Sequence, residues 1–506
     1  MSSRLPFKLD QPSLLHDGAL LNGAWVQSKT RETFQVEDPG TGRAFATCPT
    51  NKVVDVDAFV ETSHEAFSKY RHVNPRVRAK ILLKWHDLIA DAREDIAKLV
   101  TYETGKPLAE ARGEVDYALG FASWFAGEAE RIRGSVAIPS ISERRTFVVK
   151  QPIGVAVALV PWNFPVAMII RKVAAALAAG CSMIVKPSPE TPLSTLALAD
   201  LALRAGVPPG VFNVITTDNV NTPAVSESLC KHPLVRKVTF TGSTAVGKLI
   251  ARHCADGLKK VTLELGGNCP FIVFDDGDLE QAVSALMILK WRTAGQACTH
   301  ANRVYVQSGV YDKFAKMILE ATQKLRVGHG AESSTTIGAL TTPRGIQKLE
   351  NHISDAVSKG GKILCGGKRP DRDGYFFEPT IISDMISSML TTNEEIFGPL
   401  LGLYKFNTEE EVVKAANDTS MGLASYFFTS DTSRTWRLLE NLEAGMIGMN
   451  TGNSSGAESP FGGDQGVRIW QRGRKGRCYR RVPHCQDWYF DGWINSQIVV
   501  SLSQQG

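Results

Sequence analysis

Short apolar runs alternate with longer amphipathic stretches through the middle of the chain, between residues 154 and 274. Apolar runs such as residues 155–160 and 182–186 have the length of buried strands. The stretches 169–179 and 194–205 carry apolar residues at helical spacing. Strands that alternate with helices in this way predict a parallel, doubly wound sheet of the α/β class.

The flanking regions follow different patterns. Residues 18–50 predict short strands, with turns at Asn-Gly and Pro-Gly pairs, and residues 55–133 have helical spacing. A strand is predicted at residues 146–151, and a second alternating region runs from Pro270 to about residue 448. The sequence therefore predicts two α/β regions after a largely helical start.

Composition narrows the class of protein. The chain has 506 residues, too many for one ordinary core, and its 43% hydrophobic and 22% charged residues are typical of a soluble globular protein. It has no run of about 18 apolar residues that would span a membrane, and its first residues lack the apolar core of a secretory signal. Nine cysteines without a C-x-x-C pair indicate reduced thiols and no metal site. We expect a cytoplasmic protein, with a mitochondrial one as the alternative.

The net charge of +5 has a local origin. Residues 464–506 hold seven Lys and Arg and three Asp and Glu, so the rest of the chain balances at 50 against 49. This balance gives no indication of a nucleic-acid partner.

Cys298 is a candidate nucleophile because it follows a flexible Gly-Gln-Ala run between a predicted helix and a predicted strand. Cysteines are among the most buried residues, so an inert core thiol explains this one residue equally well. Two further motifs add a carboxylate and an amide: Glu264 in Leu-Glu-Leu-Gly-Gly-Asn and Asn163 in Pro-Trp-Asn-Phe-Pro. A nucleophile, a base and an amide donor together predict acyl chemistry.

The stretch from Gly242 to Lys248 follows a predicted strand and opens a predicted helix, which suits an anion. It matches neither G-x-G-x-x-G nor the phosphate loop, because Leu249 stands where Ser or Thr would bind magnesium. An ordinary strand–helix turn is the alternative. Lys186 ends another strand, at the sheet edge where nucleotides bind, although a lone lysine there is usually only solvated.

These motifs, together with Asn-Glu-Glu-Ile-Phe-Gly-Pro at 393–399 and Pro-Phe-Gly-Gly at 460–463, resemble the aldehyde dehydrogenase superfamily over residues 18–463. The resemblance implies a Rossmann-type NAD or NADP domain (1–133 and 153–264), a β oligomerisation arm (134–152) and an α/β catalytic domain (265–463). It also implies a small-molecule aldehyde substrate and a homo-oligomer, without membrane or nucleic-acid partners.

The resemblance assigns roles to individual residues. The catalytic residues would be Cys298, Glu264, Asn163 and Lys172. The cofactor-binding residues would be Pro161, Trp162, Lys186, Ser188, Gly242, Ser243, Val246, Glu395 and Phe397.

Residues 161–181 and 446–452 are similar to the succinate-semialdehyde branch of the family. In that branch, positions matching Arg171, Arg292 and Ser455 hold the far carboxylate of the substrate, a task that suits guanidinium groups. Each arginine could instead pair with a surface acid. The expected reaction is oxidation of succinate semialdehyde to succinate, in 4-aminobutyrate breakdown. The alternatives are another carboxylated semialdehyde, such as glutarate semialdehyde, or an inactive homologue.

Two local departures from the branch affect regulation and cofactor choice. Thr299 and His300 follow the nucleophile where many members carry a second cysteine, so we expect no disulfide within this loop. Pro189 replaces a glutamate that many NAD-dependent members carry, between Ser188 and Glu190. Reduced negative charge there makes NADP use plausible, and the choice between NAD and NADP stays open.

The similarity ends after Gly463. The basic residues 464–506 include three of the nine tryptophans. Codons for the peptide that the family carries at this position, read one base out of frame, would encode residues that resemble the beginning of this stretch. We interpret 464–506 as a tail from a frameshift or a misassigned splice, with a divergent basic tail as the alternative. Either origin puts assembly and activity in question.

Overall fold

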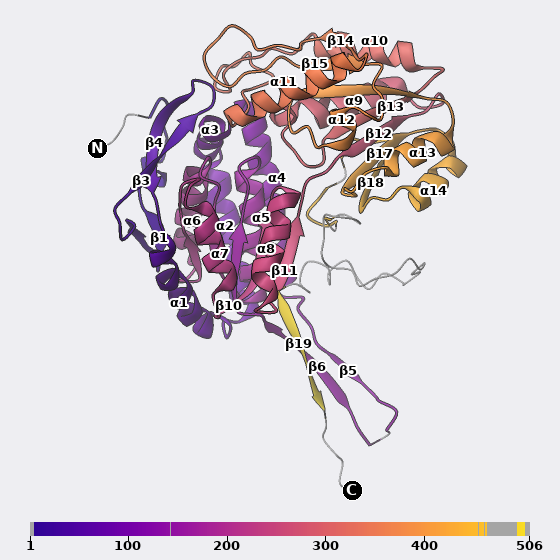
Figure 1. Cartoon of the computed structure of the whole chain (residues 1–506). Coiled ribbons are helices and arrows are strands. Elements are labelled where there is room, and N and C mark those ends of the chain that lie inside the picture. Colours follow the sequence, from indigo (N-terminus) through magenta and orange to yellow (C-terminus); the bar gives the residue numbers. More distant parts are fainter. Residues whose placement is uncertain (1–4, 142, 454, 460, 463–492, 501–506) are drawn as a thin grey trace.

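A seven-stranded sheet forms the core of the first half of the protein in the computed structural model, which describes residues 5–141, 143–453, 455–459, 461–462 and 493–500 (Figure 1). Its strand order is β11-β10-β7-β8-β9-β1-β2. The five strands from β11 to β9 are parallel, and β1 and β2 are antiparallel at one edge. The strands are β1 (Ala19–Leu21), β2 (Ala24–Val26), β7 (Val155–Leu159), β8 (Ser182–Lys186), β9 (Phe212–Val214), β10 (Val235–Thr241) and β11 (Lys260–Glu264).

Both faces of this sheet are covered by helices because its strands are apolar on both faces. Along β7, Val155 and Val157 point into one core, whereas Ala156 and Ala158 point into the other. Helices α5 and α6 pack on the alanine side with α2, α3 and α4, and α1, α7 and α8 pack on the valine side. The helices are α1 (Val53–Tyr70), α2 (Pro75–Asp91), α3 (Arg93–Thr104), α4 (Leu108–Ala129), α5 (Pro165–Ala179), α6 (Pro192–Ala205), α7 (Thr222–Lys231) and α8 (Thr244–Ala255). The predicted doubly wound sheet is confirmed.

Two helices begin earlier than the apolar pattern predicted. Helix α5 starts at Pro165 instead of Ile169, and α6 starts at Pro192 instead of Ser194. Proline suits the first helical turn because its fixed φ is already helical and its missing N–H is not needed there. Apolar spacing alone therefore misses the first turn of each helix.

The chain changes direction across the first sheet at β7. Strand β8 follows on one side of β7, whereas β10 lies on the other side. In open α/β sheets, ligands bind beyond the carboxyl ends of the strands at such a point. The residues that follow β7, β8, β10 and β11 therefore meet along one edge of the sheet.

A second seven-stranded sheet follows directly after β11, in the order β14-β15-β16-β13-β12-β17-β18. All neighbouring pairs are parallel except β14 with β15. Its strands are β12 (Cys269–Val273), β13 (Ala301–Gln307), β14 (Lys362–Cys365), β15 (Thr380–Ser383), β16 (Leu400–Phe406), β17 (Ala424–Phe428) and β18 (Met446–Met449). Its helices are α9 (Leu279–Trp291), η2 (Arg292–Gly295), α10 (Tyr311–Thr322), α11 (Pro343–Ser358), α12 (Leu390–Asn393), α13 (Glu409–Asn417) and α14 (Thr432–Asn441).

A narrow three-stranded sheet projects from the unit that contains the first sheet, below β10 and β11 in the view of Figure 1. Strand β6 (Thr146–Pro152) pairs with β5 (Ser135–Ala137) on one side and with β19 (Ile494–Val500) on the other. Strand β19 belongs to the tail that the sequence marks as aberrant, yet it pairs with β6 over seven positions, from Ile494 with Pro152 to Val500 with Thr146. Residues 464–492 lie outside the described part of the chain. Near the N-terminus, η1 (Pro12–Leu14) and a hairpin of β3 (Thr33–Asp38) and β4 (Arg43–Pro49) complete the fold.

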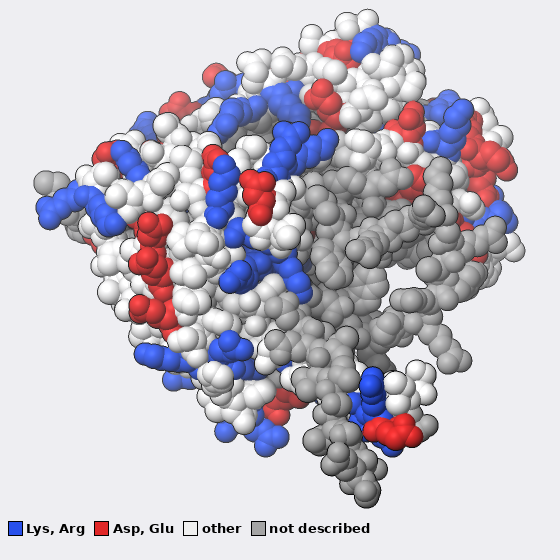
Figure 2. Space-filling view, turned by 60° about the horizontal axis from the view of Figure 1, so that its bottom comes forward, with Lys and Arg blue, Asp and Glu red and all other residues white. Residues whose placement is uncertain are grey.

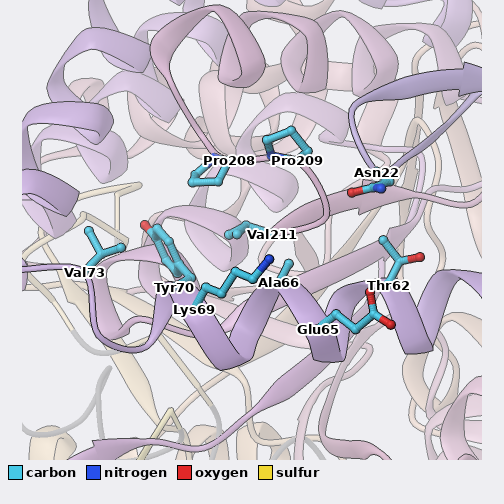
Figure 3. Close-up of a pocket in the computed structure, with 10 residues that line it drawn as sticks. All are labelled: Asn22, Thr62, Glu65, Ala66, Lys69, Tyr70, Val73, Pro208, Pro209 and Val211. Carbon is cyan, nitrogen blue, oxygen red and sulfur yellow. The ribbon is translucent and has the colours of Figure 1, made fainter.

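Neither the surface charge nor the pocket described below indicates where the functional site lies. Acidic and basic side chains are interspersed on the face shown in Figure 2. Among the described residues, no helix is long and apolar enough to cross a membrane, and no cluster of side chains is suited to a metal ion. A pocket of about 230 Å³ beside α1 contains none of the residues singled out by the sequence (Figure 3). It is lined by Asn22, Thr62, Glu65, Ala66, Lys69, Tyr70, Val73, Pro208, Pro209 and Val211.

Candidate active site

Cys298 lies between η2 and β13, directly after a strained turn formed by the residues of η2. Thr293, Ala294 and Gly295 all have left-handed φ angles, of 53°, 49° and 75°. Such a φ costs a non-glycine residue about 1–3 kcal/mol, so the surroundings must hold this turn in place. A Cβ on Gly295 would lie 2.1 Å from the Gly398 carbonyl oxygen, so only glycine allows the turn to pack against this loop.

Polar side chains hold the turn from both sides. The carboxylate of Glu110 on α4 accepts a hydrogen bond from the Thr293 N–H at 2.6 Å. The Gln296 side chain donates to the Thr293 carbonyl at 3.0 Å and accepts from the Thr341 N–H at 3.1 Å. Burial raises the pKa of Glu110 to about 7, against the opposing effect of the Thr293 N–H. The position of Cys298 is therefore fixed by contacts that reach across to α4.

Asn163 lies beside the same turn. It follows β7, and its side-chain Nδ2 donates to the Gln296 carbonyl at 2.9 Å, two residues before Cys298. A primary amide carries two N–H groups, so Asn163 can keep this bond and donate a second one to a bound substrate. The structure thus brings the predicted amide donor to the nucleophile turn.

A buried ion pair holds the backbone of this region. Lys106 and Glu114 lie 2.5 Å apart, Nζ to Oε2, with side chains that are each 1% exposed. The Lys106 ammonium also donates to the Asn163 carbonyl at 2.8 Å. The other oxygen of Glu114 accepts from the Val166 and Ala167 N–H groups at 2.8 and 3.2 Å, in the first turn of α5. Residues of the 106–117 segment therefore fix the start of α5 and the peptide that carries Asn163.

Glu264 ends β11 and faces Lys172 on α5. Its Oε2 accepts a hydrogen bond from the Thr241 hydroxyl at 2.7 Å and lies 3.3 Å from the Lys172 ammonium. Lys172 also donates to the Thr239 hydroxyl at 3.0 Å. Burial raises the pKa of Glu264, but Lys172, Arg171 and the Thr241 hydroxyl outweigh it and hold that pKa at about 2. The carboxylate is therefore ionised at neutral pH and engaged by a cation.

The Cys298 thiol is half-buried, and its surroundings disfavour the thiolate. Burial raises the pKa of Cys298 above its ordinary value, and the carboxylates of Glu395 and Glu264 and the Cys269 thiol add to this effect, whereas Arg171 opposes it. The Cys269 thiol donates to the Cys298 carbonyl at 3.4 Å. In this state the nucleophile holds its proton, so catalysis requires a base nearby.

At the end of β8, Lys186 presents a buried ammonium at the edge of the sheet. Its Nζ donates to the Pro187 carbonyl at 2.9 Å, and burial lowers its pKa to about 8. The Ser188 hydroxyl donates to the Glu190 carboxylate, which also accepts from Asn219 at 3.1 Å. A carboxylate therefore lies beside Ser188 even though Pro189 occupies the position that is glutamate in many family members.

The start of α8 supplies backbone N–H groups at the same edge. Ser243 caps the helix by accepting from the Val246 N–H at 3.4 Å. A Cβ on Gly242 would lie 2.6 Å from the Phe240 ring, so glycine is needed where the chain turns. A helix N-terminus beside a buried ammonium fits a phosphate-bearing cofactor.

The remaining predicted cofactor residues meet on the other side of this edge. Trp162, next to Pro161, and Phe397 pack edge to face, with ring centroids 5.5 Å apart and planes at 85°. The Glu395 carboxylate accepts from the Gly267 N–H at 3.1 Å, and burial raises its pKa to about 7. An aromatic pair, a carboxylate acceptor and the Lys186 ammonium fit the ring, hydroxyl and phosphate groups of a dinucleotide.

Arg171, on α5, is the centre of a third group of site residues. Its guanidinium is 4% exposed and donates to the Tyr117 hydroxyl at 2.8 Å. That hydroxyl lies 2.5 Å from the hydroxyl of Ser455, which places two of the three predicted carboxylate-binding residues in one hydrogen-bonded chain. Arg292 begins the nucleophile turn, with its side chain over the Phe164 ring at 5.5 Å.

Sequence reasoning missed the contribution of one segment. Residues Lys106, Glu110, Glu114 and Tyr117 all reach site elements, although the region was predicted only as helical. The last three are spaced by four and three positions, which places them on one helix face. Charged residues at helical spacing among apolar ones were the available signal.

Known proteins are similar to this chain in sequence and in fold. A sequence model described as the aldehyde dehydrogenase family matches residues 25–468. An NADP(+) succinate-semialdehyde dehydrogenase of Escherichia coli (strain K12) is 46% identical over 468 residues, covering 92% of this chain and 96% of that protein. A glutarate-semialdehyde dehydrogenase of Pseudomonas aeruginosa is also 46% identical over 468 residues, with the same coverage. The crystal structure of succinate-semialdehyde dehydrogenase from Burkholderia pseudomallei superposes with a TM-score of 0.93 at 43% identity, covering 98% of this chain and 100% of that one. The resemblance carried by the motifs is confirmed.

Proposed function

The chain belongs to the aldehyde dehydrogenase family, and on this premise we propose that it oxidises succinate semialdehyde to succinate with NAD or NADP. The observation that carries the proposal is the Arg171–Tyr117–Ser455 chain in a site that also holds Cys298, Glu264 and Asn163. A buried guanidinium selects an anionic group, and the far end of succinate semialdehyde is a carboxylate.

The first step is attack of the Cys298 sulfur on the aldehyde carbon. The new C–S bond converts the carbonyl oxygen to an oxyanion, which accepts hydrogen bonds from the Asn163 amide and the Cys298 backbone N–H. One such donor typically contributes about 3–4 kcal/mol of transition-state stabilisation. Because burial raises the pKa of the Cys298 thiol, a carboxylate must take the thiol proton as the bond forms. Glu264 is fully ionised at neutral pH, whereas Glu395, with a pKa of about 7, is only partly ionised.

NAD or NADP, when bound, supplies the hydride acceptor, and loss of hydride leaves a thioester on Cys298. Lys186 would bind the adenosine ribose and the α8 start at Ser243 the pyrophosphate. Glu395 and the Trp162–Phe397 pair would hold the nicotinamide ribose and ring. The neighbouring Ser188, Gly242 and Val246 complete this surface.

The last step is hydrolysis of the thioester. Glu264 first releases the thiol proton to solvent and then takes a proton from the attacking water, and the C–S bond breaks to return Cys298 and release the carboxylate product. A positioned base of this kind contributes typically about 10²–10⁴-fold. A carboxylate with a pKa of about 2 is a weak base, so Glu264 must part from Lys172 before it acts. Lys172 therefore holds the base in a resting position.

Turnover of a series of aldehydes tests this proposal. We expect kcat/KM for succinate semialdehyde to exceed that for butanal, which has the same chain length without the carboxylate, by at least tenfold. Glutarate semialdehyde is the second candidate because a relative of equal identity bears that name. A higher kcat/KM for glutarate semialdehyde would favour this candidate, and equal values for butanal would contradict recognition of a carboxylate.

We also propose that the projecting sheet joins copies of the chain into a homo-oligomer. Its exposed apolar side chains include Val136 at 64%, Ile138 at 72% and Val149 at 43% exposed. Light scattering after size-exclusion chromatography tests this, and a monomer would contradict it. The seven free cysteines among the described residues favour a reducing compartment such as the cytoplasm.

A further inference from the structure

The hydroxyl of Tyr117 occupies the centre of the Arg171 group. It lies 2.8 Å from Arg171 Nη2 and 2.5 Å from Ser455 Oγ. The ring packs edge to face on Phe121, with centroids 5.1 Å apart and planes at 89°. The Arg171 guanidinium lies over the rings of Phe121 and Phe461, at 4.5 and 4.6 Å. This packing fixes both the phenol and the guanidinium.

Counting hydrogens shows what this arrangement can donate. A guanidinium has no acceptor, so the Tyr117 oxygen must accept from Arg171. The bond between Tyr117 and Ser455 uses one hydrogen of the two hydroxyl groups, whichever of them donates. One O–H hydrogen remains that neither bond uses. It belongs to Tyr117 or to Ser455 and is therefore close to the Arg171 guanidinium.

We propose that Tyr117 is a specificity-determining residue that binds the carboxylate of the substrate together with Arg171 and Ser455. This inference rests on the proposed function. The carboxylate accepts one hydrogen bond from the guanidinium and one from the Tyr117 O–H, whose hydrogen is available when the Ser455 hydroxyl donates to the Tyr117 oxygen. An aldehyde with an uncharged tail would leave the half-buried Tyr117 O–H without an acceptor, which costs affinity.

The competing explanation is that Tyr117 only supports Arg171. Because Arg171 itself binds the carboxylate, a supporting Tyr117 would also raise KM for carboxylated aldehydes alone. Its effect would then multiply with that of Ser455→Ala, since the two residues would act independently. If Tyr117 and Ser455 instead share one O–H donor, the two effects do not multiply, so the explanations differ in the KM of the double variant.

Tyr117→Phe is the test, because it keeps the ring and its contact with Phe121 and removes only the hydroxyl. We expect KM for succinate semialdehyde to rise about 10- to 100-fold, the usual effect of losing a hydrogen bond to a charged group. We expect kcat to change by less than about threefold and KM for butanal to stay the same. The dissociation constant of succinate, measured by calorimetry, should rise by a similar factor without any turnover.

Two controls sharpen the result. Tyr375→Phe removes a hydroxyl that contacts Glu37 at 2.9 Å away from this group, and its kinetics should match those of the natural protein. Ser455→Ala combined with Tyr117→Phe should raise KM by much less than the product of the two single effects, because both hydroxyls serve one bond.

Failure of the inference and failure of the proposed function are distinguishable. If the natural chain turns over succinate semialdehyde but Tyr117→Phe leaves KM and succinate binding unchanged, the role of Tyr117 is rejected. KM effects of Tyr117→Phe and Ser455→Ala that multiply in the double variant would assign Tyr117 to support of Arg171 and reject it as a donor. Equal losses for butanal and succinate semialdehyde would show a general effect on the site and also reject it. If the natural chain discriminates against succinate semialdehyde, the proposed function itself is wrong.

Discussion

Replacing Lys172 with methionine removes the ammonium that faces the Glu264 carboxylate. The side chain of Lys172 is 4% exposed and that of Glu264 is 12% exposed, so solvent screens this ion pair weakly. Methionine has a similar length and fills the space of the lysine stem. The substitution therefore changes the charge at this position more than the packing.

The size of the effect follows from the separation of the two charges. Across 3.3 Å, two unit charges at an effective dielectric constant of about 20 interact by about 5 kcal/mol. This corresponds to about 3–4 pKa units. Removing Lys172 should raise the pKa of Glu264 from about 2 to about 5–6. Arg171 and the Thr241 hydroxyl still lower it in the variant, and burial still raises it.

The pH dependence of kcat between pH 5 and pH 9 is the assay, with the rate of thioester hydrolysis followed separately by rapid quench. In the natural protein, protonation of Glu264 makes no acid limb in this range because its pKa lies far below it. Lys172→Met should show an acid limb with an apparent pKa of about 5–6, and Lys172→Arg, which keeps the charge, should not. A flat profile for folded Lys172→Met would refute the reasoning.

The Glu264–Lys172 ion pair also affects the stability of the protein. The folded-state pKa of Glu264 lies below its unfolded value, so the pair contributes stability that is present above about pH 4.5 and is lost as the pH falls towards 2. Lys172→Met should lose this contribution, and its unfolding midpoint should depend less on pH between pH 5 and pH 3. A pH dependence identical to that of the natural protein would contradict this assignment.

Three further predictions concern other parts of the site. Asn163→Ala should lower kcat by about 10²–10³-fold in stopped-flow measurements of reduced cofactor, and a loss below threefold would contradict its role as oxyanion donor. Lys106→Met should destabilise the protein by about 3–5 kcal/mol because it leaves Glu114 buried without its cation. Lys316→Met, in an exposed ion pair, should change stability by less than about 0.5 kcal/mol. Equal urea midpoints for the two variants would refute this difference. Peroxide should inactivate the enzyme by oxidising Cys298 to a sulfenic or higher acid instead of a disulfide, because Thr299 and His300 offer no second thiol in its turn. A disulfide between Cys298 and any other cysteine, found by mass spectrometry, would contradict this.

Much of the fold followed from the sequence because its strands are short, apolar and regularly spaced. Strand β8 has the predicted bounds, and β7 ends one residue earlier than predicted. The aberrant tail was the exception: no strand was predicted within residues 464–506, yet residues 494–500 pair with β6. Backbone hydrogen bonds do not depend on side-chain identity, so an unusual sequence can still complete a sheet.

The candidate site was predictable to the extent that each residue stood in a motif. Cys298, Glu264 and Asn163 belong to three such motifs, and the structure places all three at the carboxyl edge of the first sheet or the turn facing it. The resting ion pair of Glu264 with Lys172 was not predictable, because it joins residues 92 positions apart. The same holds for Tyr117, which meets Ser455 across 338 positions. Contacts of this kind depend on tertiary packing that local patterns do not encode.

Formation of NADH or NADPH from succinate semialdehyde, by this chain and by its Cys298→Ala variant, tests the central claim most directly. We predict saturable turnover by the natural chain and none by the variant, with both proteins equally folded by circular dichroism. Turnover that survives in Cys298→Ala would contradict the assignment of the nucleophile. No turnover by well-folded natural chain with either cofactor would contradict the proposed function for this protein.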